Sequence, residues 1–396
     1  MKRRGKVSLT DKQGSRPLYL HPNMLIIYSV TLMAVLGVSS ITPAFPKIVN
    51  DLGISPRSVG LLITVFTLPG IFLTPVMGVL ADRFGRKKIL GPSLIFFAVA
   101  GTGCFFTREF ETLLWMRLLQ GVGAASIGAI NVTLIGDLYS GRQRTAAMGY
   151  NSGVLSVGTA FYPVIGGAMA TLEWYYPFIL PVLALPVALL VLFSLNNPEP
   201  KSEGSLREYL RGTYTSVKDR RVISLFAAGI VTFVILFGAY LTNFPLLMWE
   251  SFKISPFVIG LVMSTMSVST ALTSWKLGWL AGKFSEQTLL KTSYLFYASA
   301  LVMIPLAPNL WTLIIPTALA GIANGINIPT IHSLLSELAP LEQRGVFMSI
   351  NGMMLRVGQT SGPLLAGAAL GVFGLGGSFF VGAALALVML ILIILL

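Results

Sequence analysis

Charged residues are scarce in this chain. They make up 11% of its 396 residues, whereas 54% are hydrophobic. A water-soluble domain has a larger charged share, typically about 25%. The composition therefore indicates a chain that lies mainly within a lipid bilayer, and it argues against a soluble nucleic-acid-binding protein.

Other absences exclude further classes of protein. Cys104 is the single cysteine, so an intramolecular disulfide is impossible. No segment has the form GxxxxGK[ST], so ATP is not a supported energy source. The loops are too short for a soluble catalytic domain, and no nucleophile, base and orienting acid cluster in the sequence. We therefore expect no enzymatic activity, no cofactor and no metal ion.

Long apolar stretches fill the chain, each able to cross a bilayer, which takes about 20 residues. They cover residues 24–46, 59–80, 89–106, 112–137, 145–172, 174–195, 222–249, 256–280, 290–306, 311–337, 345–372 and 374–396. We predict an all-α integral membrane protein with twelve transmembrane helices.

The second six stretches repeat the first six at a shift of 200 positions. Between Leu134–Gly167 and Leu334–Gly367, 11 of 34 positions are identical without a gap. Two halves with the same direction through the membrane imply a pseudo-twofold axis along the membrane normal, as in alternating-access transporters. The repeat thus predicts two pseudo-symmetric six-helix bundles around a central site for a small-molecule substrate.

The bundles and their flanking segments divide the chain into four parts. We expect an N-terminal tail over 1–23, one bundle over 24–195, a linker over 196–221 and the second bundle over 222–396. In the linker, Ser205 and Glu208 have the spacing of a capping box, and apolar residues follow at helical intervals. A short amphipathic helix on the membrane surface is the predicted structure, and a flexible charged linker is the alternative.

Basic residues gather on one side of the predicted membrane. Of the 28 Lys and Arg residues, 21 lie in the tails and loops on the side of residue 1 and only Lys47, Arg57, Arg108 and Lys253 on the other. By the positive-inside rule, this asymmetry predicts that both termini lie in the cytoplasm. We expect a multi-pass protein of the cytoplasmic membrane. The net charge of +13 therefore encodes topology and not a nucleic-acid partner.

The loop between the second and third stretches carries a motif. Residues 78–88 read GVLADRFGRKK, which resembles the signature GxLaDrxGrkx of the major facilitator superfamily. The resemblance implies a conformational latch: the equivalent of Asp82 holds the halves together when the carrier faces outward, and the equivalent of Arg86 pairs with an acid at the position of Asp137. The predicted latch comprises Gly78, Asp82, Arg83, Gly85, Arg86 and Asp137. A generic basic loop, the alternative, explains neither the glycines nor Asp82.

The second half carries only a degenerate copy of this loop. Gly282 stands at the position equivalent to Asp82, and Glu286 at the position equivalent to Arg86. We therefore expect the latch to be asymmetric.

The fifth stretch resembles the spacing Gx8Gx3GPx2GG of the 12-helix drug:proton antiporters in this superfamily. The matching residues are Gly149, Gly158, Pro163, Gly166 and Gly167. Tyr162 stands where that pattern has a glycine. The resemblance implies export of drug-like compounds, and the alternative is close helix packing without that meaning, since small residues let membrane helices approach.

Few ionisable side chains are predicted inside the membrane, and none of them is a carboxylate. A cation within a transmembrane segment is costly and marks a functional-site candidate. The candidates for substrate binding or proton coupling are Arg117, Arg356, His332, Asn131 and Asn327. Arg117 begins a segment that resembles the RxxqGxgaa motif of the same antiporters. The two arginines could instead bind backbone carbonyls, and His332 could be a hydrogen-bonded packing group.

These features together predict a monomeric secondary transporter that exports small lipophilic compounds, coupled to proton influx. The lack of interior carboxylates speaks against cationic substrates and suits neutral or anionic amphipathic ones. A carrier or flippase for an anionic metabolite or lipid is the rival within transport. A sensor or scaffold that kept the fold without transport is the rival from another class.

Overall fold

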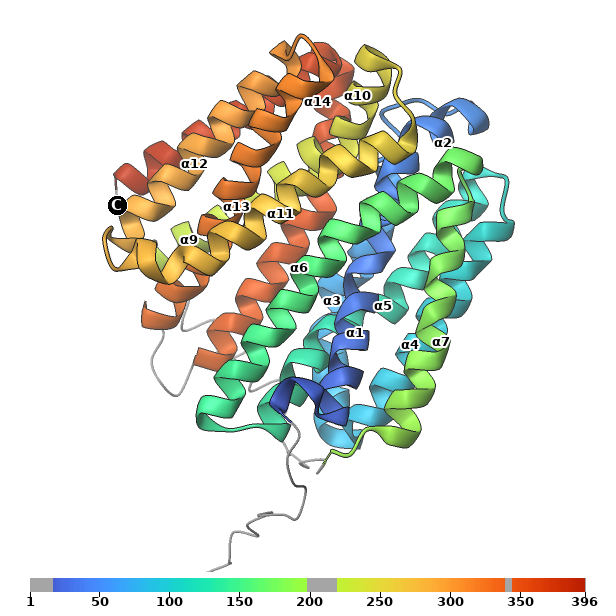
Figure 1. Ribbon diagram of the computed structural model, residues 1–396, viewed down its shortest axis with the longest axis vertical. Helices are drawn as coiled ribbons and strands as arrows, with labels where there is room; N and C mark the ends of the chain where they lie inside the picture. The colour runs from blue at the N-terminus through green and yellow to red at the C-terminus, as the bar shows by residue number, and fades with distance from the viewer. Residues whose placement is uncertain (1–16, 198–218, 339–343, 396) are drawn as a thin grey trace, which may run out of the picture.

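The computed structural model describes residues 17–197, 219–338 and 344–395, and these residues form an all-helical chain (Figure 1). The first half holds α1 (Pro22–Ser39), α2 (Phe45–Leu52), α3 (Leu61–Phe84), α4 (Arg86–Phe106), α5 (Phe110–Leu138), α6 (Gly141–Leu172) and α7 (Ala184–Leu189). The second half holds α9 (Arg220–Val234), α10 (Phe244–Phe252), α11 (Pro256–Ala281), α12 (Glu286–Met303), α13 (Leu310–Leu338) and α14 (Arg344–Ile394). Turns of other pitch join or extend them at Thr42–Ala44, Tyr176–Leu183, Leu190–Ser194 and Ile235–Asn243.

Eleven helical segments in the described part of the chain are long and apolar enough to span a membrane. The last of them, in α14, is too long for one crossing, because 45 residues at about 1.5 Å each exceed twice a bilayer core of about 30 Å. Gly374 interrupts α14 with a φ of 75°, a conformation that favours glycine. Two consecutive transmembrane helices therefore meet at Gly374, which brings the count to the predicted twelve.

Helix ends lie several residues from the predicted boundaries. The first crossing runs on through α2 to Leu52, six residues past its predicted end, and α6 begins at Gly141, before the predicted 145. Apolar composition marks only the part of a helix inside the hydrocarbon, whereas the backbone can continue its hydrogen bonds into water. The predicted linker ran to 221, but α9 already begins at Arg220. The linker's predicted amphipathic helix lies outside the described residues.

Each half encloses its own hydrophobic core. The first core is built by buried side chains between Met24 and Leu195 together with Leu246, and the second by those between Val222 and Ile393. In Figure 1 the blue-to-green and the yellow-to-red helices form two bundles side by side. Two separately packed cores allow each bundle to move as a unit, because the contacts within it do not depend on the other bundle.

The bundles meet along two helix pairs, α6 with α11 and α3 with α14. Glycines bring α6 and α11 together: a Cβ on Gly167 would overlap the Pro256 carbonyl oxygen, and one on Gly260 would overlap that of Pro163. On α11, Ser267 donates to the carbonyl of Thr159 at 3.0 Å. We call the contact between α3 and α14 the seam.

The bundles touch at one end of the molecule and separate at the other. At the distal end, where α1 leads into α2, helix α2 packs against α10, and Arg57 Nη2 donates to the Gly371 carbonyl at 3.1 Å. At the terminal end, where α1 begins and α3 stops, a Cβ on Gly78, Gly149 or Gly352 would meet no atom within 4 Å. Hydrogen bonds between the halves lie toward the distal end, and α6 and α11 diverge toward the terminal end (Figure 1).

Two glycines of the fifth-stretch motif should respond in opposite ways to an added methyl group. Gly167→Ala forces α6 away from α11, and we expect it to lower the free energy of unfolding by about 1–3 kcal/mol, the cost of overpacking. Gly149→Ala enters open space and should leave stability unchanged or higher. Thermal unfolding of the two purified variants in one detergent measures this, and equal melting temperatures would contradict the packing described.

Candidate functional site

The predicted latch residues lie together at the terminal end of the first half. Gly85 separates α3 from α4 with a φ of 106°, a backbone conformation that favours glycine. This turn brings Arg86 into an ion pair with Asp82 and, through its Nε at 3.0 Å, with Asp137 Oδ2 on α5. Arg86 is buried, whereas Asp82 remains partly exposed. The guanidinium of Arg83 lies over the Phe84 ring.

The ion pairs of the latch among the described residues lie within the first half. Asp82 is paired with Arg86 in its own half, and the space next to Gly78 is open. In the second half Glu286 accepts a hydrogen bond of 2.6 Å from Ser333 on α13. The two halves thus join equivalent helices in different ways. In the first half Arg86 links α4 to α5 through an ion pair with Asp137, and in the second half Glu286 links α12 to α13 through a hydrogen bond from Ser333.

Arg117 on α5 is enclosed within the first half. Its side chain is 1% exposed. Its Nε donates to the Leu62 carbonyl at 3.1 Å, its Nη1 donates to Gln120 Oε1 at 2.6 Å, and its guanidinium lies 4.2 Å from the centre of the Phe66 ring. These contacts bind α5 to α3, so the position favours a packing role over direct contact with a substrate.

Asn131 belongs to a polar clamp that joins three helices of the first half. Its Nδ2 donates to the Thr31 hydroxyl at 2.6 Å, and the same hydroxyl hydrogen-bonds Asn151 Oδ1. Asn131 and Thr31 are buried. The clamp fixes α1 against α5 and α6 at mid-helix, where a buried polar group needs a partner.

Asn327 forms a comparable clamp in the second half. The Thr232 hydroxyl donates to Asn327 Oδ1 at 2.8 Å, and Asn327 Nδ2 donates to the Ser293 hydroxyl at 2.8 Å. The Tyr294 hydroxyl donates to the Ala228 carbonyl at 2.6 Å and lies 2.9 Å from the Thr232 hydroxyl. Both halves therefore brace their core helices with neutral hydroxyl and amide groups.

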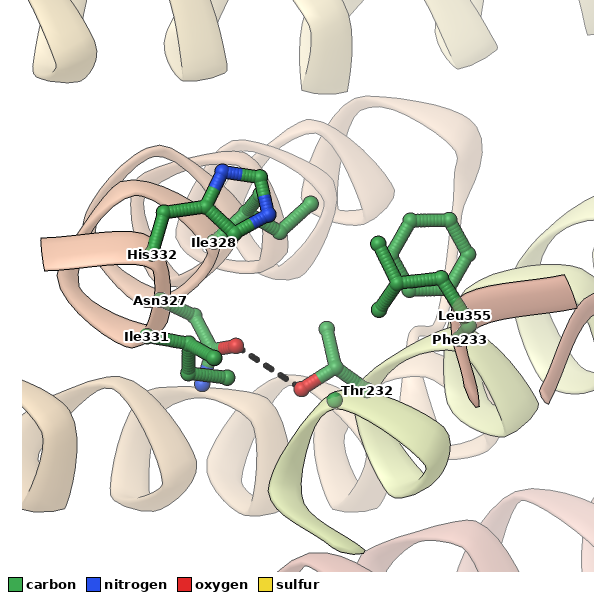
Figure 2. Close-up of a pocket in the computed structure, with 8 residues that line it drawn as sticks. Thr232, Phe233, Asn327, Ile328, Ile331, His332 and Leu355 are labelled. Atoms are coloured by element: carbon green, nitrogen blue, oxygen red, sulfur yellow. Dashed lines mark hydrogen bonds between the residues drawn. The ribbon is translucent and has the colours of Figure 1, made fainter. Parts of the chain in front are cut away.

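His332 lines a small pocket beside this second clamp (Figure 2). The pocket is bounded by α13, α9 and α14, with Phe233 of α9 and Leu355 of α14 across from the imidazole. No described residue forms a hydrogen bond or ion pair with His332. An imidazole without a fixed partner can bind and release a proton without first breaking a structural contact.

Arg356 on α14 lies in the seam between the halves. Its guanidinium packs on Gly70 of α3, whose missing side chain leaves the room: a Cβ there would lie 3.3 Å from Nε. Its Nη1 donates to Gln359 Oε1 at 3.2 Å. The structure therefore brings His332 and Asn327 to one pocket, while Arg117 and Arg356 contact α3 from different halves.

The remaining motif glycines face helix neighbours. Gly158 lies against Leu32 and Val35 of α1, and a Cβ on Gly166 would overlap the Ser40 carbonyl oxygen. Tyr162, where the pattern has glycine, is buried. The fifth-stretch motif thus fits α6 to α1 and α11 near the distal end.

Sequence reasoning missed the hydroxyl groups of the seam. Thr64 donates to the Thr360 carbonyl at 3.1 Å, and the Thr360 hydroxyl donates to Thr67 Oγ1 at 2.9 Å. All three side chains are buried. The available signal was the spacing of Thr64 and Thr67, which places two hydroxyls near one face of the second stretch.

Removing the hydroxyl at the centre of the first clamp should destabilise the protein. Thr31→Val keeps the shape but leaves the Asn131 and Asn151 amides without this partner, an expected loss of about 1–3 kcal/mol. Thr133→Val is the matched control, because Thr133 is exposed and bonds only carbonyls of its own helix. Melting temperatures of both variants test this, and an equal drop in the two would refute the clamp.

Comparisons with known proteins agree with this architecture. The chain matches the sequence profile of the Major Facilitator Superfamily over residues 27–248 and 227–396. It is 26% identical to Multidrug resistance protein 1 of Bacillus subtilis (strain 168), over 87% of this chain and 88% of that protein. It is 25% identical to Quinolone resistance protein NorA of Staphylococcus aureus (strain COL), over 88% of this chain and 90% of that protein.

Solved structures share the fold. A bacterial homologue of the human lysosomal transporter Spinster, in an inward-facing and occupied conformation, superposes with a TM-score of 0.79 at 16% identity, over 96% of this chain and 97% of that one. The nucleoside transporter NupG superposes with a TM-score of 0.80 at 13% identity, over 94% and 99%. The chain belongs to the major facilitator superfamily and is a multi-pass membrane transporter, not an enzyme.

Proposed function

We propose that this transporter exports small lipophilic compounds by alternating access, driven by proton influx. The observation that carries the proposal is the one-sided opening: the bundles touch distally, whereas Gly78 and Gly352 face open space at the terminal end. A carrier that opens to one side at a time needs two rigid units with such a separable contact. The two relatives named for multidrug and quinolone resistance support the direction of transport.

The terminal end faces the cytoplasm in this proposal. The excess of Lys and Arg on that side, 21 against 4, supports the assignment through the positive-inside rule. The described conformation is then open to the cytoplasm, ready to receive a compound from the cell interior. Rocking of the two bundles would close this end and open the distal one.

Proton coupling in the proposal rests on His332. No Asp or Glu is among the buried side chains of the described residues, so a carboxylate is not available there to take the proton inside the membrane. His332 lines the pocket at the Asn327 clamp without a polar partner of its own. Its protonation would add a charge between α9 and α13 and so bias the second bundle toward one state.

The latch would stabilise the opposite, outward-facing state. In the described state Asp82 contacts only its own half, through Arg86. On closure of the cytoplasmic end it could dock against the second half, where a carboxylate is favoured near the N-terminus of a helix. In the described state Asp137 holds Arg86 through an ion pair.

Transport by purified protein in liposomes with an imposed pH gradient tests the proposal and His332 together. We expect wild type to accumulate a quinolone or a lipophilic dye when the gradient is applied. His332→Asn removes the titratable group, so gradient-driven accumulation should fall at least about tenfold, while downhill flux persists. A wild type without gradient-driven flux of any lipophilic compound would favour a sensor or scaffold.

The other histidine of the chain provides the matched control. His21 precedes α1 and lies 3.4 Å from the Tyr139 hydroxyl at the terminal end, away from the pocket. His21→Asn should retain accumulation. Equal loss in both variants, or none in His332→Asn, would rule out His332 as the proton carrier.

Neutralising Asp82 should shift the conformational balance without unfolding the protein. In a Cys104→Ser background, a cysteine at Gly352 reports on the open cytoplasmic end through its reaction with a polar thiol reagent. Asp82→Asn should raise this labelling several-fold, because the closed state loses its latch. Arg142→Gln on the exposed surface is the control, and unchanged labelling in Asp82→Asn would exclude the latch.

A further inference from the structure

The seam between the halves ends abruptly at Arg356. Toward the distal end the contact is closed by Thr64, Thr67 and Thr360, whose hydroxyl groups bridge α3 and α14. One helical turn further toward the cytoplasmic end lies Arg356, packed on Gly70. Another turn along the same face of α14 lies Gly352, which meets nothing within 4 Å. The guanidinium therefore lies where the two bundles begin to separate.

Among the residues that the structure describes, Arg356 forms no ion pair with an acidic side chain. Within the described part of the chain its single hydrogen bond goes to Gln359, and no carboxylate forms an ion pair with it. Its side chain is nevertheless partly exposed. A guanidinium held against lipid at this depth would be costly, which favours an orientation of the exposed part toward the space between the bundles.

The two interior arginines differ in what they can still bind. Arg117 is enclosed by a carbonyl, an amide and an aromatic ring, and the backbone of Phe66 leaves no room even for a Cβ on the neighbouring Gly121. Arg356 uses one Nη group within its own helix and keeps donors for a ligand. Arg117 Nη2 also has no hydrogen-bond partner, but it is buried inside the first bundle. Arg356 is partly exposed, so of these two arginines it is the one that an anion can reach without disrupting a packed contact.

From this geometry we propose that Arg356 binds the carboxylate of an amphipathic monoanion, and that such lipophilic acids are a substrate class of this transporter. The proposal rests on the export function above and specifies its cargo. A guanidinium fork matches a carboxylate with two parallel hydrogen bonds. The lipophilic body of the compound would extend along the apolar walls of α3 and α14 into the opening between the bundles.

The charge of the interior supports the same class of cargo. No Asp or Glu is buried among the described residues, so a cation would find no fixed counter-charge there. A carboxylate at Arg356 would in contrast neutralise a charge that the described residues leave uncompensated. Gly70 is part of this arrangement, since a larger residue would push the guanidinium out of the seam.

Three probes with one hydrophobic body separate the possibilities. Pyrenebutyrate, its primary amide and a pyrene-bearing quaternary ammonium are transported in liposomes of neutral phosphatidylcholine, so that anionic lipid is absent. For wild type we expect flux of the carboxylate and the amide. In Arg356→Gln the half-saturating concentration of the carboxylate should rise at least about tenfold, the loss of a charge-assisted pair, while that of the amide stays constant.

Two further variants define the role of the fork. Arg356→Lys keeps the charge and loses the fork, so it should recover part of the carboxylate flux. Arg142→Gln removes an exposed surface charge and should match wild type for all probes. Unchanged amide flux in Arg356→Gln also shows that this variant folds.

Four results would overturn the assignment. Two concern Arg356→Gln: an equal loss of flux for the neutral and the anionic probe, or no loss of flux for either. The third is a preference of wild type for the quaternary ammonium. The fourth is that a fluorescent anionic lipid requires Arg356 for binding while the flux of the carboxylate does not. The last result would identify a lipid headgroup site. Wild-type flux of the amide or the ammonium without the carboxylate overturns only this inference, whereas absence of all flux overturns the export function.

Discussion

A guanidinium inside a membrane must be satisfied by protein groups or by a water-filled space, and this requirement organises the molecule. Arg117 meets it in part inside one bundle, where Leu62 and Gln120 accept from Nε and Nη1 and Phe66 supplies a π face, while Nη2 is buried without a hydrogen-bond partner. That contact holds α5 against α3 within the first bundle. Arg356 meets the requirement differently, because it lies on the boundary of the bundles and depends on the space between them. Arg117 thus contributes to the packing of the first bundle, whereas the surroundings of Arg356 depend on how the two bundles are positioned relative to each other.

The contact between bundles is made of groups that can separate at low cost. Hydroxyl groups of Thr64, Thr360 and Ser267 bond across it, and glycines allow backbones to touch. Neutral hydrogen bonds of this kind contribute about 0.6 kcal/mol on average in a membrane, and a hydroxyl can turn to a carbonyl of its own helix when the bundles part. A buried ion pair across the same surface would leave two uncompensated charges on separation. The composition of the interface is therefore suited to repeated opening.

The sequence predicted the parts of the structure that composition and internal repetition control. The 200-residue repeat gave the two bundles, and the loop motif gave Arg86 and Asp137 as neighbours although 51 positions separate them. The seam and the clamps were beyond reach for a physical reason. Apolar composition tells how deep a residue lies but not which face of its helix meets which neighbour, so Thr31 and Thr360 looked like any membrane threonine.

For Arg117 and Arg356 the sequence predicted a position within the membrane and the energetic cost of a charge there. It did not predict which groups each guanidinium contacts. Both are cations within long apolar stretches, and their surroundings separate them only in three dimensions, 1% exposure for Arg117 against partial exposure for Arg356. Gln120 and Gln359 each stand three residues after their arginine, so both sites share the spacing Arg-x-x-Gln. Both arginines face α3, and what differs is the residue that they meet there: the Phe66 ring for Arg117 and Gly70 for Arg356.

The charge of the cargo bears on how much work the proton must do. Moving one elementary charge through a membrane potential is worth about 2.3 kcal/mol per 100 mV. A monoanion that leaves a cell with a negative interior is driven outward by that potential, whereas a cation is held back by it. An exporter of lipophilic acids therefore requires less from its proton coupling than an exporter of cations. Because less coupling energy is needed, His332 could suffice as the proton carrier without a buried carboxylate. The uncompensated charge of Arg356 is then available to the anionic cargo.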